Sequence, residues 1–315
     1  LAHRVDSRCF QGLSVMGILD QVFARYEAQG AFMPAWRWAL ADPAAYVERS
    51  LCIQHQESDL DFVSRLLREE GLFWWFEHEA GDSETLGRHT LVIADHNGAL
   101  APAQPERVRY TQAVASLAED SLHHWREQRH AHVAQVSFAS WDYRSMGDRL
   151  VQTLETGPCA ANGTTWADMP GLYAYEDSTQ GERLVRCWMD ALASRAHLVH
   201  ARGSVRHLAP GQHFTLAGHP RHAGAEANAE ANRHAVLRVV HRARNNLSAD
   251  VRAQIQPETA RSEDTPVYTQ ELLALPLNRP VRAAVLDTLE GRVLLQPRPT
   301  VVGAQTALVV GQDGP

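Results

Sequence analysis

The chain has 315 residues, 44% of them hydrophobic, and is therefore long enough to bury the cores of two or three domains. Its formal net charge is -7, which argues against a general nucleic-acid-binding protein, because such proteins carry an excess of basic side chains. All 30 basic residues are Arg, and the lack of Lys excludes P-loop, protein-kinase and pyridoxal-phosphate chemistry, and a Ser-Lys dyad, from this chain.

Cysteine usage predicts isolated thiols in a reducing compartment, because no C-x-x-C pair occurs among Cys9, Cys52, Cys159 and Cys187. No apolar run approaches the length of about 18 residues that a membrane span needs, so we expect no stable membrane insertion. The chain begins at Leu1 without a signal peptide, and we interpret it as a fragment of a longer protein.

The first predicted element is a helix that Ser14 caps and Gly30 ends. Its apolar residues recur at helical spacing: Val15, Ile18, Leu19, Val22, Phe23 and Tyr26. Trp36 and Trp38 follow two residues apart, as on one face of a strand or turn, and core packing is the ordinary interpretation of this pair.

A second helix is predicted over 58–71, with both ends specified by the sequence. Ser58 caps its N-terminus, Asp61 answers it as in a capping box, and Gly71 supplies the left-handed residue that ends it. An apolar stripe is predicted from Leu60, Val63, Leu66 and Leu67, with i,i+4 ion pairs on the other face between Asp61 and Arg65 and between Arg65 and Glu69.

Two glutamates, Glu69 and Glu70, stand at the end of this helix where the dipole disfavours negative charge. We interpret them as partners of an Arg at an interface in preference to an acid/base pair. An aromatic extended segment then follows, turns through 81–83 and returns over 89–95, so the unit is predicted to be a strand, a capped helix and a hairpin.

The aromatic segment is Phe73, Trp74, Trp75 and Phe76. Alternate residues of a strand face opposite sides, so both faces are aromatic. Two interpretations stay open: burial within one subunit, or packing of one face against a neighbouring chain, where aromatic side chains anchor interfaces. These four residues are the candidate subunit-interface site.

Residues 96–130 are predicted to be a connection, with a loop or weak helix over 111–128 and a domain boundary nearby. Strands are predicted from about 131, at 133–141, 150–154, 197–206, 214–216, 236–243 and 251–255, around one helix at about 180–195. Short strands around an inserted helix favour an antiparallel barrel or sandwich, so the fold class is α+β and strand-rich.

No catalytic, cofactor or metal site is predicted. Residues 78–82 match the zinc-protease pattern H-E-x-x-H except for Asp82 at the last place, and they lie in a predicted hairpin loop, where the helical geometry is lost. His197 and His200 point to opposite faces of a strand, and His219 with His222 lies in a loop. The sequence also lacks a nucleophile elbow and a dinucleotide-binding fingerprint.

One ordered motif covers most of residues 54–71: Gln54-x-x-Glu57-Ser58-Asp59-Leu60-Asp61-Phe62-Val63-Ser64-Arg65-Leu66-Leu67-x-Glu69-Glu70-Gly71. Aromatic residues and a Leu-Val-Ile-x-Asp strand follow it. This arrangement resembles the signature of VgrG (Rhs/Vgr) proteins. A second stretch, 297–311, resembles the junction at which the VgrG head passes into a small oligonucleotide-binding-type barrel and a needle. VgrG proteins are the trimeric spikes of bacterial type VI secretion systems, and they are similar to the baseplate hub of contractile phage tails.

The resemblance implies a hub-like head divided into a helix-plus-hairpin domain (residues 1–105), a β-barrel domain with an inserted helix (106–296) and the junction (297–315). It implies a structural, non-enzymatic homotrimer that docks on the Hcp tube ring, carries effector or adaptor proteins, assembles in the bacterial cytoplasm and is secreted by sheath contraction. The alternatives are a phage or prophage baseplate hub and a cell-wall hydrolase.

Overall fold

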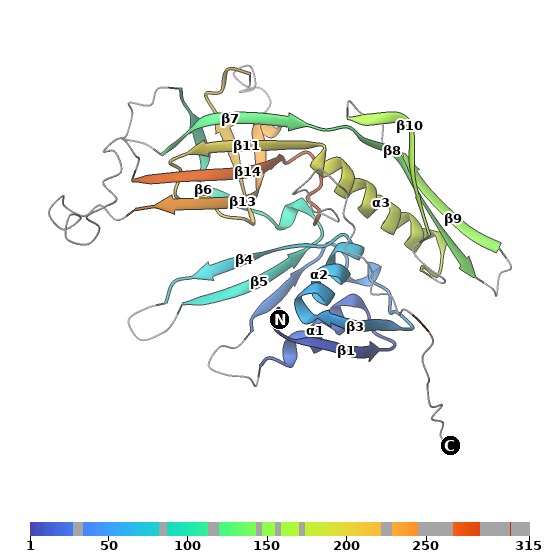
Figure 1. Ribbon diagram of the computed structural model, residues 1–315. Helices are drawn as coiled ribbons and strands as arrows, with labels where there is room; N and C mark the ends of the chain where they lie inside the picture. Colours follow the sequence, from blue (N-terminus) through green and yellow to red (C-terminus); the bar gives the residue numbers. More distant parts are fainter. Residues whose placement is uncertain are drawn as a thin grey trace, which may run out of the picture.

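The computed structural model describes residues 1–27, 34–81, 87–112, 120–142, 147–154, 159–169, 174–221, 229–244, 267–283 and 303. It is rich in strands, and its three parts lie side by side: a helix-plus-hairpin unit, a barrel, and a sheet covered by one long helix (Figure 1). No described helix is both long enough and apolar enough to cross a membrane. The predicted strand positions at 251–255 and nearly all of the predicted junction lie outside the described residues.

The helix-plus-hairpin unit begins with β1 (Val5–Phe10), which pairs antiparallel with β3 (Cys52–Ser58). Between them lie α1 (Val15–Ala24), β2 (Trp36–Ala39) and the short turn η1 (Pro43–Ala45). After β3 come α2 (Asp59–Glu69) and the hairpin of β4 (Phe73–Glu79) and β5 (Arg88–Ala94), with β2 parallel to β5 on its other edge. The predicted strand, helix and hairpin are confirmed.

The predicted ends of α2 are also confirmed. The Asp61 N–H donates to Ser58 Oγ at 3.1 Å, and the Ser58 hydroxyl donates to the Asp61 carboxylate at 2.6 Å. At the other end Gly71 has a φ of 74°, in the left-handed region, and the Leu72 N–H donates to the Leu67 carbonyl at 2.8 Å.

The predicted apolar stripe of α2 was wrong at one residue. Leu60 is 43% exposed, whereas Phe62 is fully buried and its ring stacks on Phe10. The helix is rotated because Asp59 points inward, where its carboxylate accepts hydrogen bonds from the Tyr26 hydroxyl (2.5 Å) and the Gln54 amide (2.8 Å). Burial and this hydrogen bond raise the pKa of Tyr26 to about 12.

The barrel is closed and has six strands in the order β11-β14-β13-β12-β6-β7. Their bounds are β6 (Ala101–Tyr110), β7 (Ser121–Arg129), β11 (His197–Gly203), β12 (Gln212–Ala217), β13 (Arg233–Ala243) and β14 (Tyr268–Pro276). Strand β6 runs parallel to both of its neighbours, and the other pairings are antiparallel. Short turns η2 (Asn97–Ala99) and η4 (Ala229–Asn232) precede β6 and β13. A barrel was predicted and is confirmed.

The loop or weak helix predicted over 111–128 was wrong for its second half, which is strand β7. Its side chains alternate without a clear apolar period, since the outward His124, Arg126 and Gln128 are interleaved with the partly buried Trp125 and Glu127. The strand forms because β11 supplies its backbone hydrogen bonds from His197 onward. Local sequence carries little of this information.

The third part is a sheet in the order β10-β8-β9, from β8 (His132–Asp142), β9 (Gly147–Leu154) and β10 (Ala160–Asp168). Helix α3 (Ser178–Arg195), predicted at about 180–195, lies along one face of this sheet (Figure 1). It buries an apolar cluster of Val136, Phe138, Val151, Tyr175, Val185, Met189 and Leu192. The helix leads into barrel strand β11 through a single residue, Ala196, so the sheet and the barrel are joined by a very short link.

One apolar cluster joins the hairpin to the barrel. It contains Phe73, Trp75, Val92 and Ala94 from the hairpin, and Leu100, Ala235, Leu275 and Val281 from the barrel side. Gly211 lies at this contact with a φ of 87°, and a Cβ at that position would stand 2.1 Å from the Trp75 ring. The close approach therefore requires glycine at position 211 for two reasons: the left-handed backbone conformation and the lack of a side chain.

We predict that Gly211→Ala destabilises the protein by at least about 3 kcal/mol, because about 1 kcal/mol of left-handed strain is added to the displacement of the Trp75 indole. The matched control is Gly163→Ala, which has a φ of 78° and no atom within 4 Å of the added Cβ, so only the strain remains. Urea denaturation followed by circular dichroism measures both. Equal losses of stability in the two variants would contradict the role of the Trp75 contact.

Candidate functional site

Glu69 and Glu70 lie in a network of ion pairs at the end of α2. The guanidinium of Arg49 donates to Glu69 at 3.1 Å and to Glu70 at 2.5 Å. The second carboxylate oxygen of Glu70 accepts from Arg183, which lies 113 residues along the chain in α3. The Arg partner that the sequence predicted for these glutamates therefore exists within the same chain.

The network continues along α2 through Arg65, which donates to Glu57 at 2.5 Å and to Glu69 at 3.4 Å. Burial alone would lower the pKa of the Arg183 guanidinium, but the Glu70 carboxylate outweighs burial and the pKa is raised. The same balance holds for Arg65, where Glu57 and Glu69 oppose burial. These arginines therefore stay charged, and the network holds buried charge that is fully paired. The sequence also predicted an ion pair between Arg65 and Asp61, and this pair is not among the contacts of Arg65.

A second set of polar contacts docks α3 on the helix-plus-hairpin unit. Arg282 donates to the Asp190 carboxylate of α3 at 3.1 Å and to the Asp95 backbone carbonyl. The Asp95 carboxylate accepts from the Tyr46 hydroxyl at 2.8 Å, and the Tyr46 ring lies 4.9 Å below the Arg183 guanidinium. Burial, followed by the hydrogen bond to Asp95, raises the pKa of Tyr46 well above its usual value.

Close packing accompanies these pairs. A Cβ at Gly71 would stand 2.7 Å from the Cys187 side chain, so the end of α2 touches α3 directly. Burial raises the pKa of the Cys187 thiol, which stays in its neutral form at this contact. These contacts tie α3 to the end of α2 and to Arg282.

The four candidate interface aromatics have different environments in β4. Phe73 and Trp75 are buried toward the barrel, with their rings stacked at 5.8 Å. Trp74 is partly buried on the opposite face, with the Arg68 guanidinium over its ring. Phe76 is 50% exposed. Burial within the subunit accounts for three of the four, and contact of this strand with a neighbouring chain stays a prediction.

The tryptophan pair of β2 packs in the core, as its spacing favours. The indole N–H groups of Trp36 and Trp38 both donate to the Asp20 carboxylate of α1, at 2.7 Å and 3.1 Å. This pairing links the small sheet to α1.

The histidines do not converge within the residues that the structure describes, where no group of three or more His, Cys, Asp or Glu side chains could hold a metal ion. On β11, His197 lies near Glu127 (3.5 Å) while His200 is exposed. His219 contacts Tyr110 and Trp125, and its predicted companion His222 lies outside the described residues.

Sequence reasoning did not find Arg49, Arg183 or Arg282 as functional residues. No local signal marks them, because each Arg pairs with a carboxylate at least 20 residues away in the chain. It also did not find a groove on the outer surface of the barrel, which is described below.

The chain matches the model of the phage tail baseplate hub (GPD) family over residues 1–247. Two curated relatives from Pseudomonas aeruginosa, the type VI secretion system spike proteins VgrG1b and VgrG1a, are each 30% identical over 100% of this chain. The chain spans 38% and 43% of their respective lengths, so it corresponds to less than half of each relative.

The fold also resembles a solved structure from E. coli, described as a component of the type VI secretion system with structural similarity to the T4 bacteriophage tail proteins gp27 and gp5. That comparison covers 96% of this chain and 57% of the solved chain, with a TM-score of 0.56 and 15% sequence identity. At this identity the likeness concerns the fold.

We predict that Glu70→Gln destabilises the protein by about 2 kcal/mol, because Arg49 and Arg183 then lose a shared buried anion. The matched control is Glu77→Gln, which breaks the exposed pair with Arg37 and is expected to cost less than about 1 kcal/mol. Urea denaturation measures both. If the two variants lose the same stability, the network does not hold the parts together.

Proposed function

Because the chain belongs to the phage tail baseplate hub family, we propose that it forms the structural head of a trimeric type VI secretion spike. The spike docks on the Hcp tube ring and is ejected by sheath contraction, carrying effector or adaptor proteins into target cells. It assembles in the bacterial cytoplasm and is then secreted. The resemblance to VgrG proteins inferred from the motif at 54–71 is confirmed by the two Pseudomonas aeruginosa relatives.

The observation that carries this proposal is the way the three parts are joined. The apolar cluster between the hairpin and the barrel and the ion network between α2 and α3 make one body from segments far apart in the chain. A head that is pushed from behind must pass load without its parts sliding. Packed side chains and paired buried charges resist such sliding because each displacement exposes apolar surface or unpairs a charge.

The proposed division of this head is a helix-plus-hairpin domain at residues 1–105, a barrel domain at 106–296 and a junction at 297–315. The proposed domain boundary falls within β6, which follows the hairpin unit directly. The role is mechanical, and no bond is made or broken by the chain. The match to the phage tail baseplate hub family favours one alternative, a prophage baseplate hub. Tail genes beside the gene for this chain, in place of secretion genes, would support that alternative.

Light scattering on the purified chain, followed by pull-down with Hcp rings, tests the proposal. We expect a trimer that binds the rings. A monomer that does not bind Hcp would contradict the proposal for this chain, and turnover of peptidoglycan by the purified protein would favour a cell-wall hydrolase.

We predict that Phe76→Ser weakens trimer association by about 10-fold or more, because an exposed aromatic residue that anchors an interface loses most of its buried apolar surface. The control is Leu51→Ser, which removes an apolar side chain that is equally exposed at 51% but lies outside the aromatic segment. Sedimentation over a range of protein concentrations gives the association constant of each variant. An unchanged constant for Phe76→Ser would remove Phe76 from the subunit interface.

A further inference from the structure

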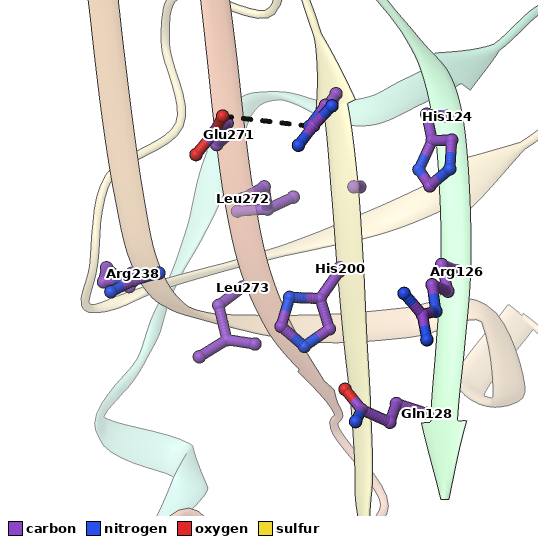
Figure 2. Close-up of a pocket in the computed structure, with 10 residues that line it drawn as sticks. His124, Arg126, Gln128, His200, Arg238, Glu271, Leu272 and Leu273 are labelled. Carbon is purple, nitrogen blue, oxygen red and sulfur yellow. Dashed lines mark ion pairs between the residues drawn. The ribbon is translucent and has the colours of Figure 1, made fainter. Parts of the chain in front are cut away.

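A groove of about 380 Å³ runs across the outside of the barrel (Figure 2). Four neighbouring strands line it, β7, β11, β14 and β13, and the lining includes two residues of the barrel core, Ala201 and Leu272, among the outer side chains. Neither the ion network nor the hairpin contact uses these residues.

The strand register places four lining residues in one row across the strands. His200 lies opposite Arg126 on one side and Leu273 on the other, and Leu273 lies opposite Arg238. Neighbouring strands are about 4.8 Å apart, so the backbones of Arg126 and Arg238 are separated by about 14 Å. In Figure 2 the leucine lies between the two basic ends of the row. The row therefore places one histidine and one leucine between two long cationic side chains.

The next row differs because it already contains an acid. Glu271 lies opposite Arg202, with 3.8 Å between their charged groups, and it also pairs with Arg242 at 2.7 Å. Within the described ranges, by contrast, neither Arg126 nor Arg238 forms an ion pair with a carboxylate. A chain with a net charge of -7 thus presents surplus positive charge at this one row.

The electrostatic field of the row is visible at its central histidine. Although His200 is exposed to solvent, partial desolvation by its neighbours lowers its pKa, and the positive charges of Arg126 and Arg238 lower it further. The register places the two arginines at the ends of this row, so an anion over Leu273 would lie between their positive charges.

We propose that this groove is a docking surface for an acidic segment of a different protein chain, in which Arg126 and Arg238 bind the carboxylate of a glutamate whose methylene groups lie on Leu273. Guanidiniums bind carboxylates through paired hydrogen bonds, and a leucine floor matches a carboxylate that is carried on a short apolar stem. The surface adds a binding role that the mechanical function does not require.

Two observations favour protein carboxylates on another chain. A nucleic acid needs a longer series of basic side chains to neutralise its successive phosphates, whereas this row offers two, Arg126 and Arg238. A second copy of this chain is a poor donor, since many of its acids, such as Glu57, Glu70 and Asp190, are already paired with its own arginines.

The test uses a hexaglutamate peptide titrated into the full chain by calorimetry at low ionic strength. We expect salt-sensitive binding that the double variant Arg126→Ala/Arg238→Ala weakens by at least 10-fold. The matched control, Arg186→Ala/Arg221→Ala, removes the same charge from exposed positions outside the groove and is expected to change binding by less than 2-fold. Circular dichroism verifies that both variants are folded.

Three outcomes would overturn the proposal. In the first, hexaglutamate does not bind to the chain, or it binds to the groove variant as strongly as to the control. Another is tighter binding of inorganic tripolyphosphate than of hexaglutamate at the same site, which would assign the row to phosphate. The third is loss of self-association in Arg126→Ala/Arg238→Ala during sedimentation without peptide, which would assign the groove to a second copy.

Discussion

The arrangement of this chain depends on one carboxylate. Glu70 ends α2, and its two oxygens are taken by arginines from opposite sides, Arg49 just before β3 and Arg183 in α3. A carboxylate this deeply buried is costly unless both of its faces are paired, so the position of α3 relative to α2 is narrowly defined. Since α3 leads directly into β11, the same constraint extends to the barrel.

Apolar packing supplies what the ion pairs cannot. Charged pairs add little free energy after desolvation, whereas the cluster around Trp75 removes aromatic surface of the hairpin and aliphatic surface of the barrel side from water. Gly211 lets the indole approach the barrel backbone. Together the two contacts hold the helix-plus-hairpin unit against the barrel and against α3. That rigidity is the physical basis of the proposed mechanical role, and it leaves function to surfaces such as Phe76 and the groove.

Local structure was predicted best where the chemistry acts over a few residues. The Ser58 cap and the left-handed Gly71 follow from side chains and backbone within about five positions of one another, so their sequence signals are complete. The family could be identified from the sequence for the same reason, because its motif is concentrated in the helix-plus-hairpin unit. The predicted apolar stripe was wrong at Leu60 alone, because Asp59 turns inward to partners on other elements.

The sequence by itself therefore determined the capped helix, the hairpin, the strand-rich class and the resemblance to spike heads. Only the tertiary structure decided the partners of Glu69 and Glu70, the strand at β7 and the row from Arg126 to Arg238. Each of these depends on groups that are distant in the chain and meet only when the barrel closes and α3 docks. Charge pairs and backbone ladders require proximity in space, and a linear pattern of residue types does not record which distant segments will be neighbours.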